Sequence, residues 1–200
     1  DAINHAKTLL EPYGKVTVSP LGTVLCTVKE SEENGIHLLL DAHIDEIGMM
    51  VSFVEDNGFV RIARFGGTDA RGLAANRVTI HTETGNINGV ICSVPPHLSD
   101  DSKTDAVPTD ESFVDTGLTT EQAKEKIRPG DRVSYQSPQI ELLNGLVSSK
   151  ALDDRTGCIT LIKVLEELNG EIPFGLTVMF SAMEEVGGMG AETSAFAVKP

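Results

Sequence analysis

The amino-acid sequence predicts an α/β domain that is interrupted by a small inserted β-barrel, and three observations support this prediction. Apolar runs at residues 36–40 and 176–180 have the length of buried strands, and each is followed by histidine or carboxylate residues. An apolar stripe at helical spacing lies between these runs, within residues 158–168. Over a long middle stretch the helical spacing almost disappears, and short β-rich runs alternate with Asn-Gly and Thr-Gly turn signals. The expected α/β domain consists of residues 1–54 and 143–200. The expected insertion between these two parts consists of residues 55–142.

The first part of the α/β domain is expected to hold one helix and several strands. Apolar residues at helical spacing predict a helix within residues 1–10, and Pro12 and Gly14 end it. Residues 15–28 are rich in β-branched side chains around a Pro-Leu-Gly break, which indicates two short strands joined by a turn. A further strand is predicted at residues 47–54 and is assigned to this first part.

Short strands dominate the predicted insertion. The clearest β-rich runs lie at residues 59–63, 77–81 and 88–92. One helix is predicted at residues 119–127, because a threonine can cap its start and Pro129-Gly130 ends it. The polar stretch at residues 98–110 is expected to be a mobile loop.

The second part of the α/β domain begins near Gly145. A helix follows in the predicted pattern, and Asp154 or a neighbouring residue can cap its start. After the strand at residues 176–180, Glu184 and Glu185 stand at its carboxyl end, and a glycine-rich turn leads into a last helix. Ligand crevices of open α/β sheets lie at the carboxyl ends of the strands, so polar residues at these ends are candidates for chemistry.

Composition and charge exclude several classes of function. The chain has 16 Lys and Arg against 30 Asp and Glu, and its formal net charge of −14 repels phosphate backbones and anionic lipid. We therefore expect no nucleic-acid partner and no membrane partner. The three cysteines, Cys26, Cys92 and Cys158, have no Cys-x-x-Cys spacing and are expected to be small buried residues in a reducing compartment. Because the first residues also lack the pattern of a signal peptide, a cytoplasmic location is predicted.

His43 and Asp45 follow the first apolar run at a spacing of two residues. In an extended segment both side chains point the same way, so the carboxylate could hold one ring nitrogen while the other binds a metal ion. A strand-end histidine beside a solvated aspartate is the commoner explanation when this pair is taken alone.

Asp153 and Asp154 stand at the start of the predicted helix. A carboxylate has two oxygens and can bridge a close pair of metal ions, which makes Asp153 a candidate ligand. Helix capping is the commoner explanation for adjacent aspartates, and it is the one we expect for Asp154.

Glu184 and Glu185 end an apolar strand, where neighbouring side chains point to opposite sides. One of them could face a metal ion while the other faces substrate. A solvated pair of charges is the more common situation, but the buried strand before them and the Val-Gly-Gly after them do not suit idle charges.

Six motifs are spread over nearly the whole chain: Ala42-His-Ile-Asp-Glu-Ile-Gly48, Phe65-Gly-Gly67, Pro95-Pro-His97, Ile127-Arg-Pro-Gly-Asp131, Lys150-Ala-Leu-Asp-Asp-Arg-Thr-Gly157 and Glu184-Glu-Val-Gly187. Together they resemble the co-catalytic metallo-aminopeptidases of metallopeptidase family 42, the glutamyl, deblocking and tetrahedral aminopeptidases. The resemblance implies a three-layer, zinc-peptidase-like α/β catalytic domain with a mixed sheet, interrupted by a β-barrel dimerisation domain.

The same resemblance implies a role for each candidate residue. His43 would ligate one metal ion, Asp153 would bridge both ions, and Glu185 would ligate the other. Glu184 would act as the general base and Asp45 would orient His43. Two divalent ions per subunit are expected, with zinc first and cobalt or manganese as replacements.

The implied activity is the hydrolysis of N-terminal residues from peptides, with a metal-bridging water as the nucleophile. The implied partners are peptide substrates and further copies of the chain, from dimers to dodecamers, joined through the insertion. One alternative is a related binuclear metallo-deacylase, carboxypeptidase or dipeptidase, although these usually carry the extra domain after the Glu-Glu strand. Another is a catalytically incomplete fragment that acts as an assembly or peptide-binding module. An endoglucanase would need two carboxylates flanking a sugar, and the His43 pattern fits metal better.

Members of the resembled family begin earlier than this chain and continue beyond Pro200, where they supply a further aspartate and a further histidine as ligands. The chain is therefore expected to be part of a longer protein and to be inactive as an isolated chain of 200 residues. The other histidines, for which structural roles are the commoner explanation, are His5, His37, His81 and His97.

Overall fold

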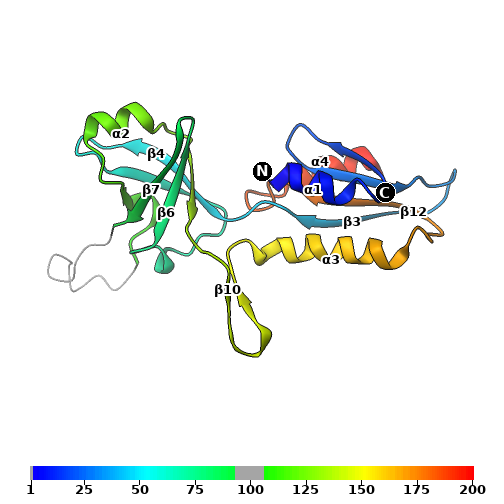
Figure 1. The fold of residues 1–200 in the computed structure, drawn as a ribbon. Coiled ribbons are helices and arrows are strands. Elements are labelled where there is room, and N and C mark those ends of the chain that lie inside the picture. Colours follow the sequence, from blue (N-terminus) through cyan, green and yellow to red (C-terminus); the bar gives the residue numbers. More distant parts are fainter. Residues whose placement is uncertain (1, 93–105) are drawn as a thin grey trace. The chain divides into compact units, whose positions relative to one another are not determined.

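The computed structural model describes residues 2–92 and 106–200 (Figure 1). They form two compact units, of which unit 1 comprises Asp1–Glu46 and Ala151–Pro200 and unit 2 comprises Ile47–Lys150. The Pro95-Pro-His97 motif and most of the predicted loop at residues 98–110 lie outside the described residues. No helix in the described part of the chain is long and apolar enough to span a membrane.

Unit 1 is built on a four-stranded mixed sheet. The strand order is β1 (Lys15–Val18), β2 (Val24–Lys29), β12 (Gly175–Ser181) and β3 (His37–His43). The first three strands pair antiparallel, whereas β12 and β3 run parallel and in register along their whole length. Strand β12 is buried throughout, as expected for a central strand with both faces covered.

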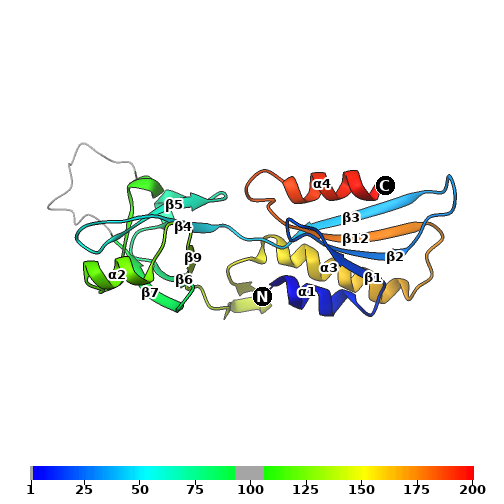
Figure 2. The same cartoon turned by 90° about the horizontal axis from the view of Figure 1, so that it is seen from above.

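Helices cover both faces of this sheet. Figure 2 shows α1 (Ala2–Leu10) and α3 (Leu152–Leu168) on one side of the strands and α4 (Met189–Val198) on the other. Leu10, Leu165 and Phe180 belong to the core between the first two helices and the sheet. Side chains of this size contribute about 1.5–3 kcal/mol each when fully buried. Helix α4 starts so close to the end of β12 that a Cβ atom on Gly190 would lie 2.0 Å from the carbonyl oxygen of Ala182. The predicted three-layer α/β fold is confirmed.

Unit 2 contains a closed six-stranded barrel, as predicted. Its strand order is β4 (Gly48–Val54), β5 (Val60–Phe65), β8 (Phe113–Asp115), β7 (Gly85–Ile91), β6 (Arg77–Thr82) and β9 (Arg132–Tyr135). All neighbouring strands pair antiparallel. Alternate side chains such as Val60, Ile62, Val78 and Ile80 fill the interior.

The structure corrects the assignment of one strand. The sequence pattern places residues 47–54 with the α/β domain, but β4 pairs with β5 and β9 inside the barrel. Met49 and Val51 face the barrel core. Apolar spacing shows which face of a strand is buried but not which sheet the strand joins. The division at the other end also differs, falling after Lys150 rather than near residue 142.

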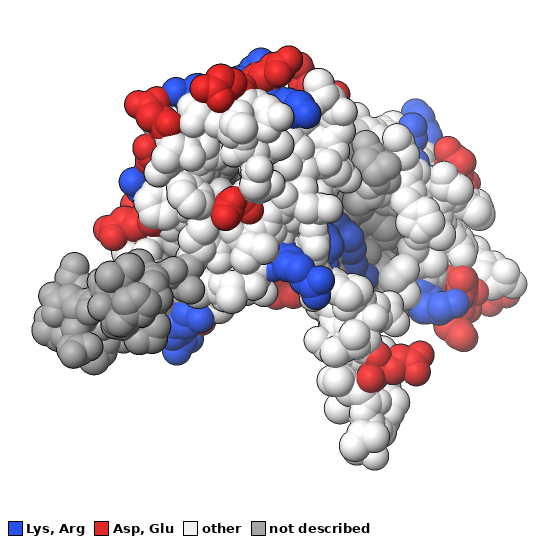
Figure 3. Space-filling view, turned by 60° about the vertical axis from the view of Figure 1, so that its left-hand side comes forward, with Lys and Arg blue, Asp and Glu red and all other residues white. Residues whose placement is uncertain are grey.

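Short elements complete unit 2. Helix α2 (Thr120–Lys126) starts with a capping box between Thr119 and Gln122. Three 3-10 turns are described, at Ala70–Gly72, Thr109–Glu111 and Leu143–Gly145. Strands β10 (Ile140–Glu141) and β11 (Val147–Ser148) form a separate hairpin. This hairpin is a projection with few charged side chains in Figure 3.

Candidate metal centre

The parallel pairing of β3 and β12 places the ends of both strands side by side. His43, the last residue of β3, is opposite Ser181, the last residue of β12. The pairing continues one step further, because the backbone N–H of Ile44 donates to the carbonyl of Ser181 at 2.9 Å. The residues that follow each strand are therefore neighbours, although more than a hundred residues separate them in the sequence.

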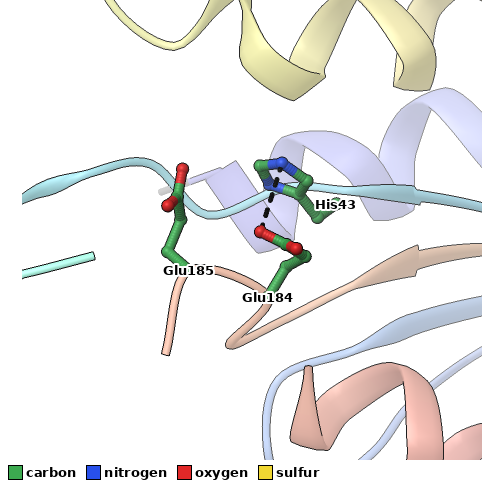
Figure 4. A group of neighbouring side chains, drawn as sticks. All are labelled: His43, Glu184 and Glu185. Carbon is green, nitrogen blue, oxygen red and sulfur yellow. Dashed lines mark ion pairs between the residues drawn. The ribbon is translucent and has the colours of Figure 1, made fainter. Parts of the chain in front are cut away.

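Three candidate residues meet at this edge of the sheet. The possible ligand atoms of His43, Glu184 and Glu185 all lie within 4.8 Å of one another. Nε2 of His43 is 3.7 Å from Oε2 of Glu184. Figure 4 shows the Glu184 carboxylate facing the imidazole ring and Glu185 beside the loop that follows β3.

Asp153 reaches His43 from the start of α3. Its Oδ1 atom is 3.1 Å from Nε2 of His43, and its side chain is 91% exposed. Asp153 and Asp154 have non-helical backbone angles, so regular helical geometry begins at Arg155. Within the described residues, Asp153 is not part of the mutually close set that contains the two glutamates, and His43 links it to that set.

Asp154 has the capping role that the sequence predicts. Its Oδ1 accepts the backbone N–H of Gly157 at 3.1 Å. A Cβ atom at Gly157 would lie 2.4 Å from the same oxygen, so a larger residue there would displace the capping carboxylate. The two adjacent aspartates therefore have different contacts: Asp154 caps the helix, and Asp153 contacts His43.

Asp45 contacts the glutamates as well as His43. Its Oδ1 and Oδ2 accept the backbone N–H groups of Glu184 and Glu185, each at 3.2 Å. Its carboxylate is 3.8 Å from Nδ1 of His43, whereas its backbone carbonyl oxygen is 3.2 Å from the same nitrogen. The proposed orienting contact to His43 is thus made by the main chain of Asp45, and the side chain holds the turn that carries both glutamates.

Both ring nitrogens of His43 face oxygen atoms that accept hydrogen bonds. A carbonyl oxygen has no proton, so Nδ1 must carry one in order to donate to the carbonyl of Asp45. Neutral imidazole then has a bare lone pair at Nε2, which faces the carboxylates of Asp153 and Glu184. The nearby carboxylates favour a second proton on the ring or a cation between Nε2 and the carboxylates.

The pKa of His43 reflects this environment. Burial lowers the pKa, since the side chain is only 11% exposed. The hydrogen bond to the Asp45 backbone, the charge of Glu184 and the hydrogen bond to Asp153 together raise it by more, so the net pKa of His43 lies above the ordinary value for histidine. An imidazole nitrogen surrounded by carboxylates is also a donor set that suits zinc and related divalent ions. The residues present therefore fit a metal ion.

The remaining histidines lie elsewhere. His5 lines an apolar cavity between α1 and α3. His37 is at the opposite end of β3 from His43 and contacts Thr177. The rise per residue of a β-strand puts the two histidines roughly 20 Å apart. His81 contacts Ser134 in the barrel. His97 lies outside the described residues.

Comparison with known families decides the relationship that the motifs suggest. The model of the M42 glutamyl aminopeptidase family matches residues 22–200, which is most of the chain. The chain belongs to the M42 glutamyl aminopeptidase family. The predicted resemblance is thereby confirmed.

Several M42 relatives show how much of such a protein the chain covers. FrvX of Escherichia coli strain K12 is 34% identical over 197 residues, which are 96% of this chain and 54% of FrvX. The TET aminopeptidase from a marine sediment thaumarchaeon is 31% identical with a TM-score of 0.87, over 97% of this chain and 56% of the other. The TET1 peptidase of Pyrococcus horikoshii is 30% identical with a TM-score of 0.85, over 98% and 59% respectively. The chain spans about half the length of these relatives.

Several supporting contacts of this M42 site have no signal in the sequence. The hydroxyl of Ser181 donates to the carboxylate of Asp41, which lies two residues before His43 on the same strand. Arg155 donates to the carbonyl of Ile44. The pairing of Asp45 with the glutamate turn also joins residues far apart in the chain. The one sequence signal for these contacts is the spacing of Asp41, His43 and Asp45, which places their side chains on the same side of an extended segment.

Proposed function

We propose that this M42 chain is the metal-binding half of a metal-dependent aminopeptidase. The observation that carries the proposal is the position of Nε2 of His43, which lies 3.1 Å from a carboxylate oxygen of Asp153 and 3.7 Å from one of Glu184. A histidine nitrogen and carboxylate oxygens gathered at one point are a ligand set that suits a divalent cation such as zinc.

His43, Asp153 and Glu185 are the residues that would hold metal in this proposal. Asp153 would be shared between two ions, since a carboxylate has two oxygens and this side chain is 91% exposed. Bound divalent ions would polarise the scissile carbonyl group and lower the pKa of the attacking water. Zinc is the first expectation, with cobalt or manganese as replacements.

Glu184 would move the proton in the reaction. Its carboxylate would accept a proton from the attacking water as the water oxygen bonds to the scissile carbonyl carbon. The same oxygen would return that proton to the leaving nitrogen as the carbon–nitrogen bond breaks. The half-exposed side chain of Glu184 and its turn, held by Asp45, support this assignment.

The substrate would be the N-terminal end of a peptide. A free α-amino group is cationic near neutral pH, and the acidic residues around His43 favour such a group over a blocked terminus. The name of the family and the TET aminopeptidase relative support the same substrate class.

The test uses the full-length parent protein, prepared metal-free. We expect leucine and glutamate anilides to be cleaved only after zinc, cobalt or manganese is added. N-acetylated anilides serve as the matched control and should resist cleavage. Full activity without metal, or equal cleavage of acetylated substrates, would refute the proposal.

We also propose that the parent protein assembles from identical subunits through unit 2. Its β10–β11 hairpin exposes aliphatic side chains that are unusual on a monomer surface: Ile140, Leu142, Leu143, Leu146 and Val147. Leu143 is 87% exposed. A two-stranded hairpin gains little stability by itself, so a second copy is a suitable support for it. A relative, the TET1 peptidase of P. horikoshii, can assemble into a tetrahedron or a large octahedral shell.

A further inference from the structure

We propose that Arg155 is a positioning residue that holds Asp153 against His43. The inference rests on the proposed metal site and concerns how that site is assembled. Arg155 touches none of the proposed ligand atoms, so it would act through the backbone that carries them.

Arg155 crosses from the start of α3 to the loop that follows β3. Its Nε donates to the carbonyl oxygen of Ile44 at 3.3 Å. One of its terminal nitrogens lies 3.8 Å from Oε1 of Glu46. These two contacts lie on either side of Asp45, so the guanidinium group spans the segment that also carries His43.

The backbone of Ile44 joins three elements of unit 1. Its N–H donates to Ser181 at the end of β12, and its carbonyl accepts the bond from Arg155 on α3. Ile44 itself continues β3 and is adjacent to His43. One residue therefore ties together the two strand ends and the helix start that carry all of the proposed ligands.

Asp153 needs such external support. Its backbone angles are not helical, so regular helical geometry does not by itself fix its position. Another tie between α3 and the end of β3 is the thiol of Cys158, whose Sγ is 3.4 Å from the carbonyl oxygen of His43. A thiol is a weak donor, whereas a guanidinium group gives a charge-assisted bond.

The direction of the Arg155 side chain is set by its surroundings. Arg155 lines a cavity of about 130 Å³ whose wall also includes Ile44, Ile162 and Phe180. Methylene groups of arginine commonly lie along apolar surface while the charged end reaches a polar partner. The guanidinium group contacts the loop while 42% of the side chain stays exposed.

The experiment compares Arg155→Met with Lys163→Met in the full-length parent protein. Lys163 is on the same helix and pairs with Glu166 on the exposed face, so its replacement also removes a cation and an ion pair. Zinc affinity is measured by competition with a fluorescent chelator, and Tm is measured on the same samples. Arg155→Met should weaken zinc binding by about 10- to 100-fold, the usual effect of residues that orient metal ligands. Lys163→Met should leave zinc affinity within about twofold.

A double-mutant cycle tests whether Arg155 acts through Asp153. Asp153→Asn should weaken zinc binding, and adding Arg155→Met to it should cause little further loss if both changes disturb the same ligand. Fully multiplicative losses would show that Arg155 acts elsewhere and would overturn the proposal. Excess zinc should restore activity to Arg155→Met, which a general loss of folded protein would not allow.

Arg155→Lys keeps the test decisive if Arg155→Met does not fold. Lysine retains the charge but cannot reproduce the planar guanidinium geometry, so zinc affinity should fall between wild type and the methionine variant. Wild-type zinc affinity in a folded Arg155 variant would overturn the positioning role alone. A wild-type protein that binds no zinc would instead overturn the proposed function.

Discussion

The Oδ2 atom of Asp45 lies 3.2 Å from the backbone nitrogen of Glu185 and accepts its N–H. The other carboxylate oxygen accepts the N–H of Glu184 at the same distance. One side chain from the loop after β3 therefore holds the backbone of the turn after β12. Because Asp45 also contacts His43 through its carbonyl oxygen, it links the imidazole and both glutamates.

We predict that Asp45→Asn loosens the glutamate turn. An amide has one acceptor oxygen, so its NH2 group must face one of the two backbone N–H donors. Zinc affinity and kcat of the parent protein should both fall, by about 10- to 100-fold. Asp56→Asn, which disrupts an exposed pair with Lys124 in the barrel, is the control and should change neither. Equal zinc affinity in Asp45→Asn and wild type would refute this linking role.

Glu184→Gln and Glu185→Gln should have different effects on the parent protein. Glu184→Gln removes the proposed base but retains its shape, so zinc should still bind while kcat falls by roughly 10² to 10⁴-fold. Glu185→Gln weakens a proposed ligand, so zinc content itself should fall and excess zinc should partly restore activity. Zinc analysis beside anilide assays separates the two. A Glu184→Gln protein that loses zinc and recovers with added zinc would reverse the assignments.

The isolated 200-residue chain should bind zinc weakly and should not cleave peptides. His43, Asp153 and Glu185 leave two ions with incomplete coordination, and two close cations repel each other. Zinc analysis after dialysis measures retention, and the full-length parent is the control. Two tightly held ions per isolated chain would mean that further ligands are present within it.

Charge on the β10–β11 hairpin should block assembly of the parent protein. Leu143→Glu combined with Leu146→Glu places carboxylates where we propose that subunits bury aliphatic side chains. Light scattering should show smaller particles for this variant. Leu21→Glu changes a partly exposed leucine of unit 1 and should leave the particle size unchanged. Wild-type particle size in the double variant would contradict assembly through the hairpin.

Cys158 should make the chain less stable at alkaline pH. Burial, followed by the charges of Asp154 and Asp41, raises the pKa of the Cys158 thiol from 9.0 to about 12. Between these values the unfolded chain releases the proton while the folded chain keeps it, so the free energy of unfolding falls as pH rises. The slope from this group is at most about 1.4 kcal/mol per pH unit. Urea unfolding of wild type and Cys158→Ala at pH 8 and pH 10 should show a smaller decline in the variant.

The main features of the fold follow from local patterns in the sequence. Buried strands can be recognised as apolar runs. The polar side chains that follow these runs can be recognised as candidates for the functional site, because the carboxyl ends of parallel strands meet at one edge of the sheet. Asp154 is recognisable as a cap from its place before an apolar stripe. Strand β4 is not assignable in this way, because its apolar face suits the barrel and the open sheet equally well.

The supporting contacts of the site are harder to predict because they depend on tertiary register. The carboxylate of Asp45 is only two residues from His43, yet its partners are the backbone groups of residues 184 and 185. Arg155 likewise pairs with a carbonyl group, which any residue at position 44 would provide. Backbone partners leave no trace in side-chain identity.

Anomalous diffraction from zinc-soaked crystals of the full-length parent protein is the most direct test of the proposed metal centre. We predict zinc peaks about 2.0–2.2 Å from Nε2 of His43 and from carboxylate oxygens of Asp153 and Glu185, the usual distances for these ligands. Glu184 should lie near the ions without ligating them. Zinc bound elsewhere, with His43 still facing Asp153 directly, would contradict the account.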